Sequence, residues 1–219
     1  MSWHKDRGPG ERRGYHHGNL REALIAAALD LIREKGPAGF TFAEAARAAG
    51  VSPAAPYRHF RDRDALLADV AKRGFEAFSR ALAHAWDGGR PNPRDAFNRV
   101  GAAYLSFARA GPAYFSAMFE SGLSLSECPD VRTEGDRAFA VLREACEALI
   151  APLPKDRRPP PLMMALHIWS LSHGIASLFG RGDAARRKLP MAAEDLLEAG
   201  VLIYLKGLGF PTDQRPPAR

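Results

Sequence analysis

Hydrophobic positions repeat with a helical period along most of the chain. Leu24, Ala28 and Leu31 fall at i, i+4 and i+7, which predicts an amphipathic helix from residue 19 to about residue 35. The same period continues through a much longer segment from Asp62 to Gly88. Further helices are expected at about residues 94–110, 112–120, 130–150, 161–180 and 190–208. Because β-branched residues are also sparse, the pattern predicts an all-α protein.

Two short helices are predicted between residues 41 and 60, one on each side of a glycine turn. Thr41 and Glu44 have the spacing of a capping box, in which each side chain bonds the other residue's backbone amide. The first of these helices ends near Gly50, which can take the positive φ of a tight turn. The next is expected to begin with Ser52 as N-cap and a proline at its first position. Pro56 then removes a backbone hydrogen bond, so we expect a distorted first turn.

This order of helix, glycine turn and short second helix is the layout of a DNA-reading helix-turn-helix. Ala54 and Ala55 are small enough to let the second helix approach base edges closely. Tyr57, Arg58 and His59 carry donors that suit phosphates. The alternative is a plain helical hairpin, in which the apolar positions are only core and Arg58 is solvated.

Positive charge is concentrated toward the N-terminus. Residues 1–63 hold 11 Lys and Arg against 7 Asp and Glu, while the rest of the chain holds 20 against 18. A basic segment of this kind suits a polyanion such as nucleic acid. Residues 1–18 are polar and turn-rich, and we interpret them as a basic arm in which Arg12 and Arg13 reach phosphates or a minor groove. An inert tail is the alternative interpretation.

Motifs and composition argue against several other classes of protein. Cys128 and Cys146 lie 18 residues apart without a CxxC pair, so neither a zinc site nor a disulfide framework is indicated. No Gly-x-Ser-x-Gly, phosphate-binding Gly-Lys-Ser/Thr loop or set of paired metal ligands is found, which argues against an enzyme and predicts no metal and no cofactor. No segment approaches 18 uninterrupted apolar residues, so a cytoplasmic protein without a membrane partner is expected.

Between Tyr15 and Leu67 the motifs follow one another as a basic arm, a capped first helix, Thr-x-x-Glu, Gly-Val-Ser, Tyr-Arg-His-Phe and Asp-x-Asp-Ala-Leu-Leu. In this order they resemble the DNA-binding domain of the TetR family of bacterial regulators. Residues 167–174 look like the Trp-x-x-x-His-Gly signature of one TetR subgroup. The resemblance implies a three-helix helix-turn-helix domain at 19–64 and a six-helix body at 65–209 that dimerises and binds ligand. The arm at 1–18 precedes them, and a frayed tail at 210–219 follows.

The resemblance also implies which residues contact double-stranded operator DNA. Phosphate contacts are implied for Thr41, Ser52, Tyr57 and Arg63, with His59 as a further backbone contact. Ala54 and Ala55 are implied to face bases. Pro56 departs from the family, because many members carry leucine or another helix-compatible residue there.

A cavity for a small-molecule effector is the expectation for the body, because the middle helices surround one in the family. Aromatic side chains are dense in residues 97–119, and aromatic walls suit an apolar or aromatic ligand. The candidate lining residues are Phe97, Tyr104, Phe107, Tyr114, Phe115, Met118, Phe119, Trp169 and His173. Ordinary core packing, and a buried structural histidine at 173, are the alternatives.

Family resemblance implies a homodimer in which the last two helices of each subunit form a four-helix interface. The candidate interface residues are Leu166, Leu197, Val201, Tyr204 and Leu205. The expected function is a sequence-specific transcriptional regulator, a repressor that its effector releases from DNA. An activator, a helical ligand-binding or scaffold protein without specific DNA binding, and a non-specific nucleoid protein stay as alternatives at this point.

Overall fold

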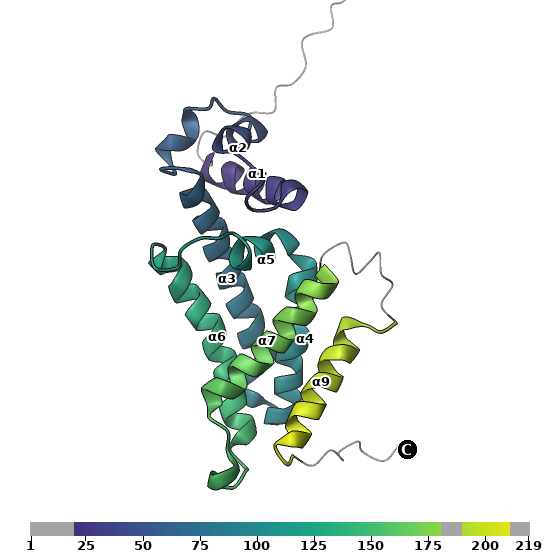
Figure 1. Ribbon diagram of the computed structural model, residues 1–219. Helices are drawn as coiled ribbons and strands as arrows, with labels where there is room; N and C mark the ends of the chain where they lie inside the picture. Colours follow the sequence, from purple (N-terminus) through teal and green to yellow (C-terminus); the bar gives the residue numbers. More distant parts are fainter. Residues whose placement is uncertain (1–19, 181–189, 211–219) are drawn as a thin grey trace, which may run out of the picture.

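The computed structural model describes residues 20–180 and 190–210, and within these ranges the regular structure is helical (Figure 1). A small unit of short helices forms one end of the molecule, and longer helices form a bundle beneath it. The predicted all-α class is therefore confirmed. The predicted arm, including Arg12 and Arg13, lies outside the described residues, as does the predicted tail except for Phe210.

The small unit contains α1 (Leu20–Lys35) and α2 (Phe42–Ala48). The predicted capping box is present at the start of α2, where the Thr41 hydroxyl accepts a bond from the Glu44 amide at 3.2 Å and the Glu44 carboxylate accepts one from the Thr41 amide at 2.8 Å. Gly50 has a φ of 73°, as expected for the turn after α2. The capped second helix and its glycine turn are thus as the sequence predicted.

The expected third helix is instead a short 3₁₀ helix, η1 (Ala55–Arg58). Ser52 is not its N-cap; Ala54 holds that position and supplies no side-chain hydrogen bond. Pro56 has no amide to donate, and its buried ring lies inside the turn. The amides of Ala55 and His59 each donate to the carbonyl three residues earlier, as in a 3₁₀ helix. The acceptors are the Ser52 carbonyl at 3.0 Å and the Pro56 carbonyl at 2.9 Å. Proline therefore changes the whole segment and not only its first turn.

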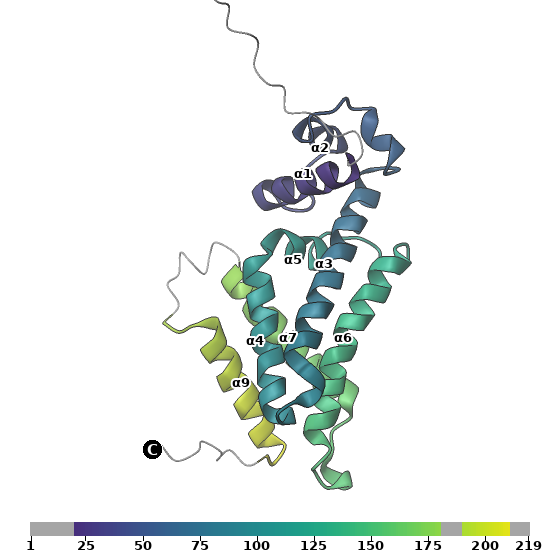
Figure 2. The ribbon, with the colours of Figure 1, turned by 180° about the vertical axis from the view of Figure 1, so that it is seen from behind.

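One long helix, α3 (Arg63–Trp86), connects the small unit to the body. Asp62, where the predicted long segment begins, caps this helix by accepting a bond from the Ala65 amide at 2.8 Å. The other body helices begin and end close to the predicted positions: α4 (Pro93–Ala110), α5 (Pro112–Phe119), α6 (Pro129–Ile150), α7 (Pro161–Gly180) and α9 (Ala193–Gly207). Short 3₁₀ segments follow α3 and α6, at Asp87–Gly89 and Lys155–Arg157. Seen from behind, α3 runs down between α4 and α6, and it packs against both (Figure 2).

Charged side chains fix α1 against α3. Asp69 accepts hydrogen bonds from Arg21 at 2.6 Å and from Arg73 at 3.1 Å. Arg73 also donates two bonds of 2.6 Å to the Glu22 carboxylate. Because α1 packs against α5 as well, the small unit contacts the body at two elements.

Helices α7 and α9 pack against each other on one side of the body (Figure 1). By length and hydropathy α7 would suit a membrane, but it packs against α4, α6 and α9 as a helix of the bundle. Three of the five residues expected at the subunit interface, Leu197, Val201 and Leu205, are buried within this chain. Of the five candidates, Leu166 is 41% exposed and Tyr204 is half-buried.

Candidate nucleic-acid interface and internal cavity

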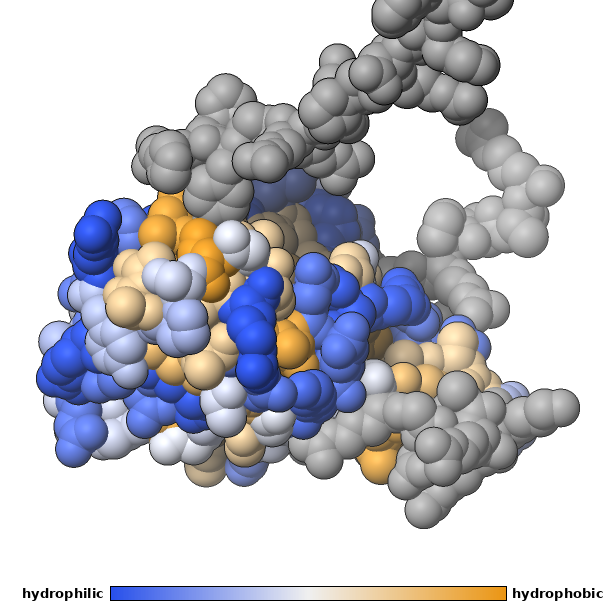
Figure 3. Space-filling model, turned by 90° about the horizontal axis from the view of Figure 1, so that it is seen from above, coloured by the Kyte–Doolittle hydropathy of each residue, from blue (hydrophilic) through white to orange (hydrophobic). Residues whose placement is uncertain are grey.

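Most side chains expected to read DNA lie on one exposed surface at the helix-turn-helix end of the molecule. The exposed ones are Thr41, Ser52, Ala54, Tyr57, Arg58 and His59. Ala55 is half-buried, because the turn that contains it packs inward through Pro56 and Phe60. Viewed from this end, hydrophilic side chains surround smaller groups of apolar ones (Figure 3). The surface thus combines small, aromatic and cationic groups, which suits contact with bases and phosphates.

Tyr57 is held in place by an aromatic contact with α2. Its ring meets the Phe42 ring edge-on, with centroids 5.1 Å apart and planes at 82°. The side chain is nevertheless 63% exposed. Among the described residues, Tyr57 carries the largest exposed ring on this surface. The contact with Phe42 therefore restrains the Tyr57 ring while the rest of the side chain stays accessible to solvent.

Two of the expected phosphate contacts are used inside the domain. The Thr41 hydroxyl bonds Glu44 as part of the capping box. Arg63 donates to the Phe40 carbonyl at 2.9 Å and to the Pro37 carbonyl, and its guanidinium lies 4.9 Å from the centre of the Phe40 ring. Both side chains therefore fix the loop between α1 and α2 and the start of α2.

Sequence reasoning missed Arg47 as a candidate contact. It lies in the last turn of α2, beside the glycine turn, and its side chain is exposed. Within the described ranges it forms no ion pair, so its charge is available to a polyanion. Helical periodicity could have identified Arg47, because Ala45 and Ala46 form the buried face of α2 and position 47 then faces outward.

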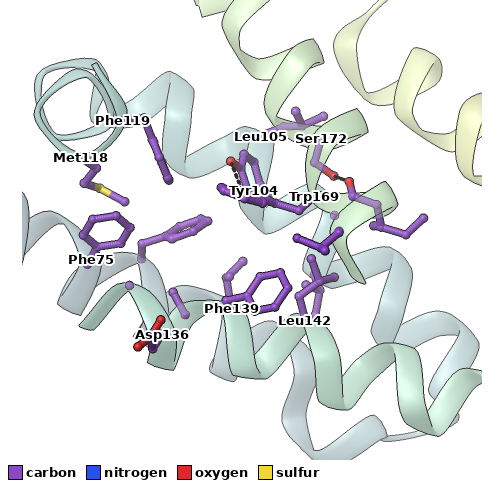
Figure 4. Close-up of a pocket in the computed structure, with 18 of the residues that line it drawn as sticks. Phe75, Tyr104, Leu105, Met118, Phe119, Asp136, Phe139, Leu142, Trp169 and Ser172 are labelled. Carbon is purple, nitrogen blue, oxygen red and sulfur yellow. Dashed lines mark hydrogen bonds between the residues drawn. The ribbon is translucent and has the colours of Figure 1, made fainter. Parts of the chain in front are cut away.

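A cavity of about 720 Å³ lies in the middle of the body (Figure 4). Helices α3, α4, α6, α7 and α9 surround it, together with the end of α5 and the loop that follows. Its wall is mostly aliphatic and aromatic, and the polar side chains at its exposed rim are Asn98, Arg132, Asp136 and Glu198. A site of this size and character suits a small, largely apolar molecule.

The structure brings five of the nine predicted lining residues to the cavity wall, and these are Phe97, Tyr104, Met118, Phe119 and Trp169. The other four, which are Phe107, Tyr114, Phe115 and His173, lie behind the wall. Phe107 packs on Phe78 with centroids 4.9 Å apart, and Phe115 stacks on His173 at 5.3 Å. Three expected interface residues, Leu166, Leu197 and Val201, also line the cavity. The two predicted sites therefore share residues.

A hydrogen-bonded group of three side chains joins α4 to α7 at the wall. The Trp169 indole donates to the Tyr104 hydroxyl at 3.2 Å, and this hydroxyl lies 3.0 Å from His173 Nδ1. Burial raises the pKa of Tyr104 strongly, despite the bond from Trp169, so its hydroxyl keeps its proton. Burial also lowers the pKa of His173, against the opposing effect of the Glu120 carboxylate, which favours a neutral imidazole.

Much of the wall was not predicted from the sequence. Phe75 and Phe78 come from α3, a helix that the sequence analysis did not assign to the cavity. Phe139 and Leu142 come from α6, and both side chains lie at the cavity in Figure 4. Their spacings of three residues put each pair on one helical face, but only the tertiary packing shows that these faces border a space.

Two family models match the chain. The model of bacterial regulatory proteins of the tetR family matches residues 24–70, and the model of the tetracyclin repressor-like C-terminal domain matches residues 97–203. The first contains α2 and η1, and the second contains most of the cavity wall. No curated protein matches the chain.

Solved structures share the fold. A protein of unknown function from Rhodococcus sp. RHA1 is 31% identical, covers 91% of this chain and 100% of its own, and superimposes with a TM-score of 0.73. The TetR family transcriptional regulator PfmR from Thermus thermophilus is 21% identical over 81% of this chain and 93% of its own, with a TM-score of 0.64. A regulatory protein in the tetR family from Rhodococcus RHA1 is 18% identical over 87% and 97%, with a TM-score of 0.67.

Proposed function

The chain belongs to the TetR family of DNA-binding transcriptional regulators and is not an enzyme, and on this premise we propose that it is a repressor released from its operator by a small, largely apolar or aromatic effector. The observation that carries the proposal is the coexistence of two sites in one chain. An exposed helix-turn-helix surface lies at one end, and an apolar cavity lies in the body. We also propose, from the spacing of Trp169, His173 and Gly174, that the chain belongs to the subgroup with a Trp-x-x-x-His-Gly signature.

Specific DNA contact is assigned to the exposed surface around η1. Tyr57, Arg58 and His59 supply donors to phosphates, and Ala54 and Ala55 approach bases. Thr41, Ser52 and Arg63 support this surface, either by direct contact or by fixing its loops. Arg12 and Arg13 reach the DNA from the arm in this proposal.

Release by effector is supported by the position of α5. Met118 and Phe119 of α5 line the cavity, and the same helix packs against α1 of the DNA-binding unit. Met118 also lies so close to Gly74 of α3 that a Cβ there would be 2.7 Å from its sulfur. A molecule that displaces these side chains therefore acts directly on the contact between body and DNA-binding unit. Coupling is reciprocal, so the effector binds more weakly to the DNA complex than to the free protein.

We assign the protein to the cytoplasm and to a homodimer. Two recognition surfaces related by a two-fold axis would match a palindromic operator with half-sites about one helical turn apart. The exposed apolar side chains of α7 and α9 supply the dimer surface, and they include Leu166 from the predicted set.

The test is binding of the full-length protein to DNA fragments from around its own gene, against random competitor DNA at a fixed salt concentration. Tight binding that resists competitor is expected for the wild type. Tyr57→Ala should weaken it at least tenfold, while Tyr114→Phe, a matched control in the body, should not. Binding to no genomic fragment in an unbiased selection would favour a ligand-binding or scaffold protein, and equal affinity for all sequences would favour a nucleoid protein.

A further inference from the structure

The hydrogen-bonding capacity of the buried cavity wall is unbalanced. Among the polar side chains that line the cavity, Tyr104 is 4% exposed and Ser172 is 3% exposed, and Trp169 lies beside them (Figure 4). The charged and amide side chains of the lining lie toward its exposed rim. Two further polar side chains of the lining are half-buried: Ser121 on the loop after α5, and Glu194 of α9, which is paired with Arg109. The deepest polar groups that a ligand can meet on α4 and α7 are therefore Tyr104, Trp169 and Ser172.

The donors of these groups are used within the protein. The Trp169 indole N–H points to the Tyr104 oxygen, and the Ser172 hydroxyl donates to the Ile168 carbonyl at 2.9 Å. We assign the Tyr104 proton to His173 Nδ1 at 3.0 Å, because burial favours a neutral imidazole, and such a ring with its proton on Nε2 accepts at Nδ1. With this assignment, the Tyr104 and Ser172 oxygens keep acceptor capacity and have no donor left to offer.

We propose that the effector carries a hydrogen-bond donor, such as a phenolic or alcoholic hydroxyl, on an otherwise apolar body and donates it to the Tyr104 oxygen. This inference rests on the proposed effector role of the cavity. An ether or ketone of the same shape would bring an acceptor against acceptors, which costs affinity. Tyr104 is therefore a specificity-determining residue, and Trp169 and His173 are positioning residues that set the direction of its hydroxyl.

The experiment uses two probes of similar shape, 2-naphthol as donor and 2-methoxynaphthalene as acceptor only. Isothermal titration calorimetry gives the ratio of their dissociation constants for wild-type protein and for Tyr104→Phe. Comparing the two proteins removes the difference in transfer of the probes from water. The preference for 2-naphthol should fall by about threefold to tenfold in Tyr104→Phe, as expected for one hydrogen bond. Tyr114→Phe, which removes a hydroxyl from a tyrosine outside the wall, should leave the ratio unchanged.

A second measurement needs no variant. The near-ultraviolet absorption of 2-naphthol moves to longer wavelength when its hydroxyl donates a hydrogen bond, and we expect this shift on binding to wild-type protein, relative to 2-naphthol in cyclohexane. An unshifted band, or a ratio that Tyr104→Phe leaves unchanged, overturns the proposed hydrogen bond. If the probes still bind, the proposal that the cavity binds an effector stands. The proposed hydrogen bond is also overturned if the wild type favours 2-methoxynaphthalene over 2-naphthol more strongly than Tyr104→Phe does. Failure of both probes to bind counts against the cavity as an effector site and removes this inference with it.

Discussion

Glu44 shows how one carboxylate organises the junction between α1 and α2. It accepts hydrogen bonds from the Thr41 amide and hydroxyl and from Lys35 Nζ, the last at 2.8 Å. These bonds, led by the one from Lys35, lower the pKa of Glu44 to about 2. A group whose pKa is lower in the folded state stabilises the fold above its unfolded pKa. The Glu44 contribution is therefore complete near neutral pH and is lost as the pH falls from about 4.5 toward 2.

Glu44→Gln should remove this pH dependence while keeping an acceptor at the N-terminus of α2. We expect the difference in free energy of unfolding between wild type and variant to be largest near pH 7 and to shrink as the pH falls from about 4.5 toward 2, because the unfolded wild-type chain binds a proton there that the folded protein does not. Urea unfolding at several pH values measures it. Glu34→Gln, on the exposed side of α1, is the matched control. A difference that is constant over this range would contradict the assigned role of Lys35 and Thr41.

Leu205 gives a second prediction, about which side of α9 faces inward. Its side chain is 1% exposed, whereas Leu202 on the same helix is 39% exposed. Leu205→Ala should lower the free energy of unfolding by roughly 2–5 kcal/mol, because it leaves a cavity in the core. Leu202→Ala should cost much less in the monomer. Chemical denaturation of both variants at low protein concentration measures the two changes in free energy of unfolding. Equal losses would mean that α9 is rotated about its axis, with another face turned inward.

Among the elements, hydrophobic periodicity and caps carried most of the information. Asp62 and the Thr41–Glu44 pair marked the starts of two helices correctly, since capping chemistry is local and can be read from a few residues. Pro56 was recognised as a disturbance, but its extent was underestimated. The proline ring is buried in the turn, and this tertiary contact, absent from local pattern rules, favours a 3₁₀ geometry over a strained α-helix.

The junction of α1 and α3 supports a third prediction. Asp69 is 13% exposed and holds Arg21 and Arg73 together, while these arginines are 49% and 31% exposed. Asp69→Asn should lower the free energy of unfolding by about 1 kcal/mol at low salt, and by less at high salt, because the arginines are accessible to screening ions. It should also weaken operator binding, since α1 is then held less firmly on α3. Asp30→Asn, whose i,i+3 pair with Arg33 is exposed, is the control. A loss independent of salt would show that packing, and not charge, fixes the junction.

For the whole molecule, the sequence predicted two functional regions but not how they share residues. Leu197 and Val201 of α9 were assigned to an intersubunit surface because the family resemblance implies that the last two helices form it. In the structure the face that carries them closes the cavity against Gly101 of α4, where a Cβ would be 3.1 Å from Leu197. Periodicity identifies an apolar face but not its partner, so it does not distinguish a helix that packs within the chain from one that packs against a second copy.

The opposite face of α9 is therefore where we expect the dimer contact. Ile203 is 72% exposed and Leu202 is 39% exposed, and α7 adds Leu162, Met163 and Leu166 with exposures of 41% to 54%. Large apolar side chains in this number on adjacent helices are unusual for a monomer surface and fit a symmetric interface between copies.

Ile203→Glu should convert the dimer to a monomer, because a charge buried in an apolar interface without a partner is costly. Sedimentation velocity over a range of protein concentrations measures the change, and circular dichroism should show that the helices remain. Leu125→Glu is the matched control, since Leu125 is an equally large apolar residue that is 49% exposed but lies on the loop after α5, outside α7 and α9. Operator affinity should fall with the dimer in Ile203→Glu, because one subunit then contacts a single half-site. A variant that stays dimeric would place the interface on another surface, and a monomer that keeps full operator affinity would mean that each subunit reads DNA independently.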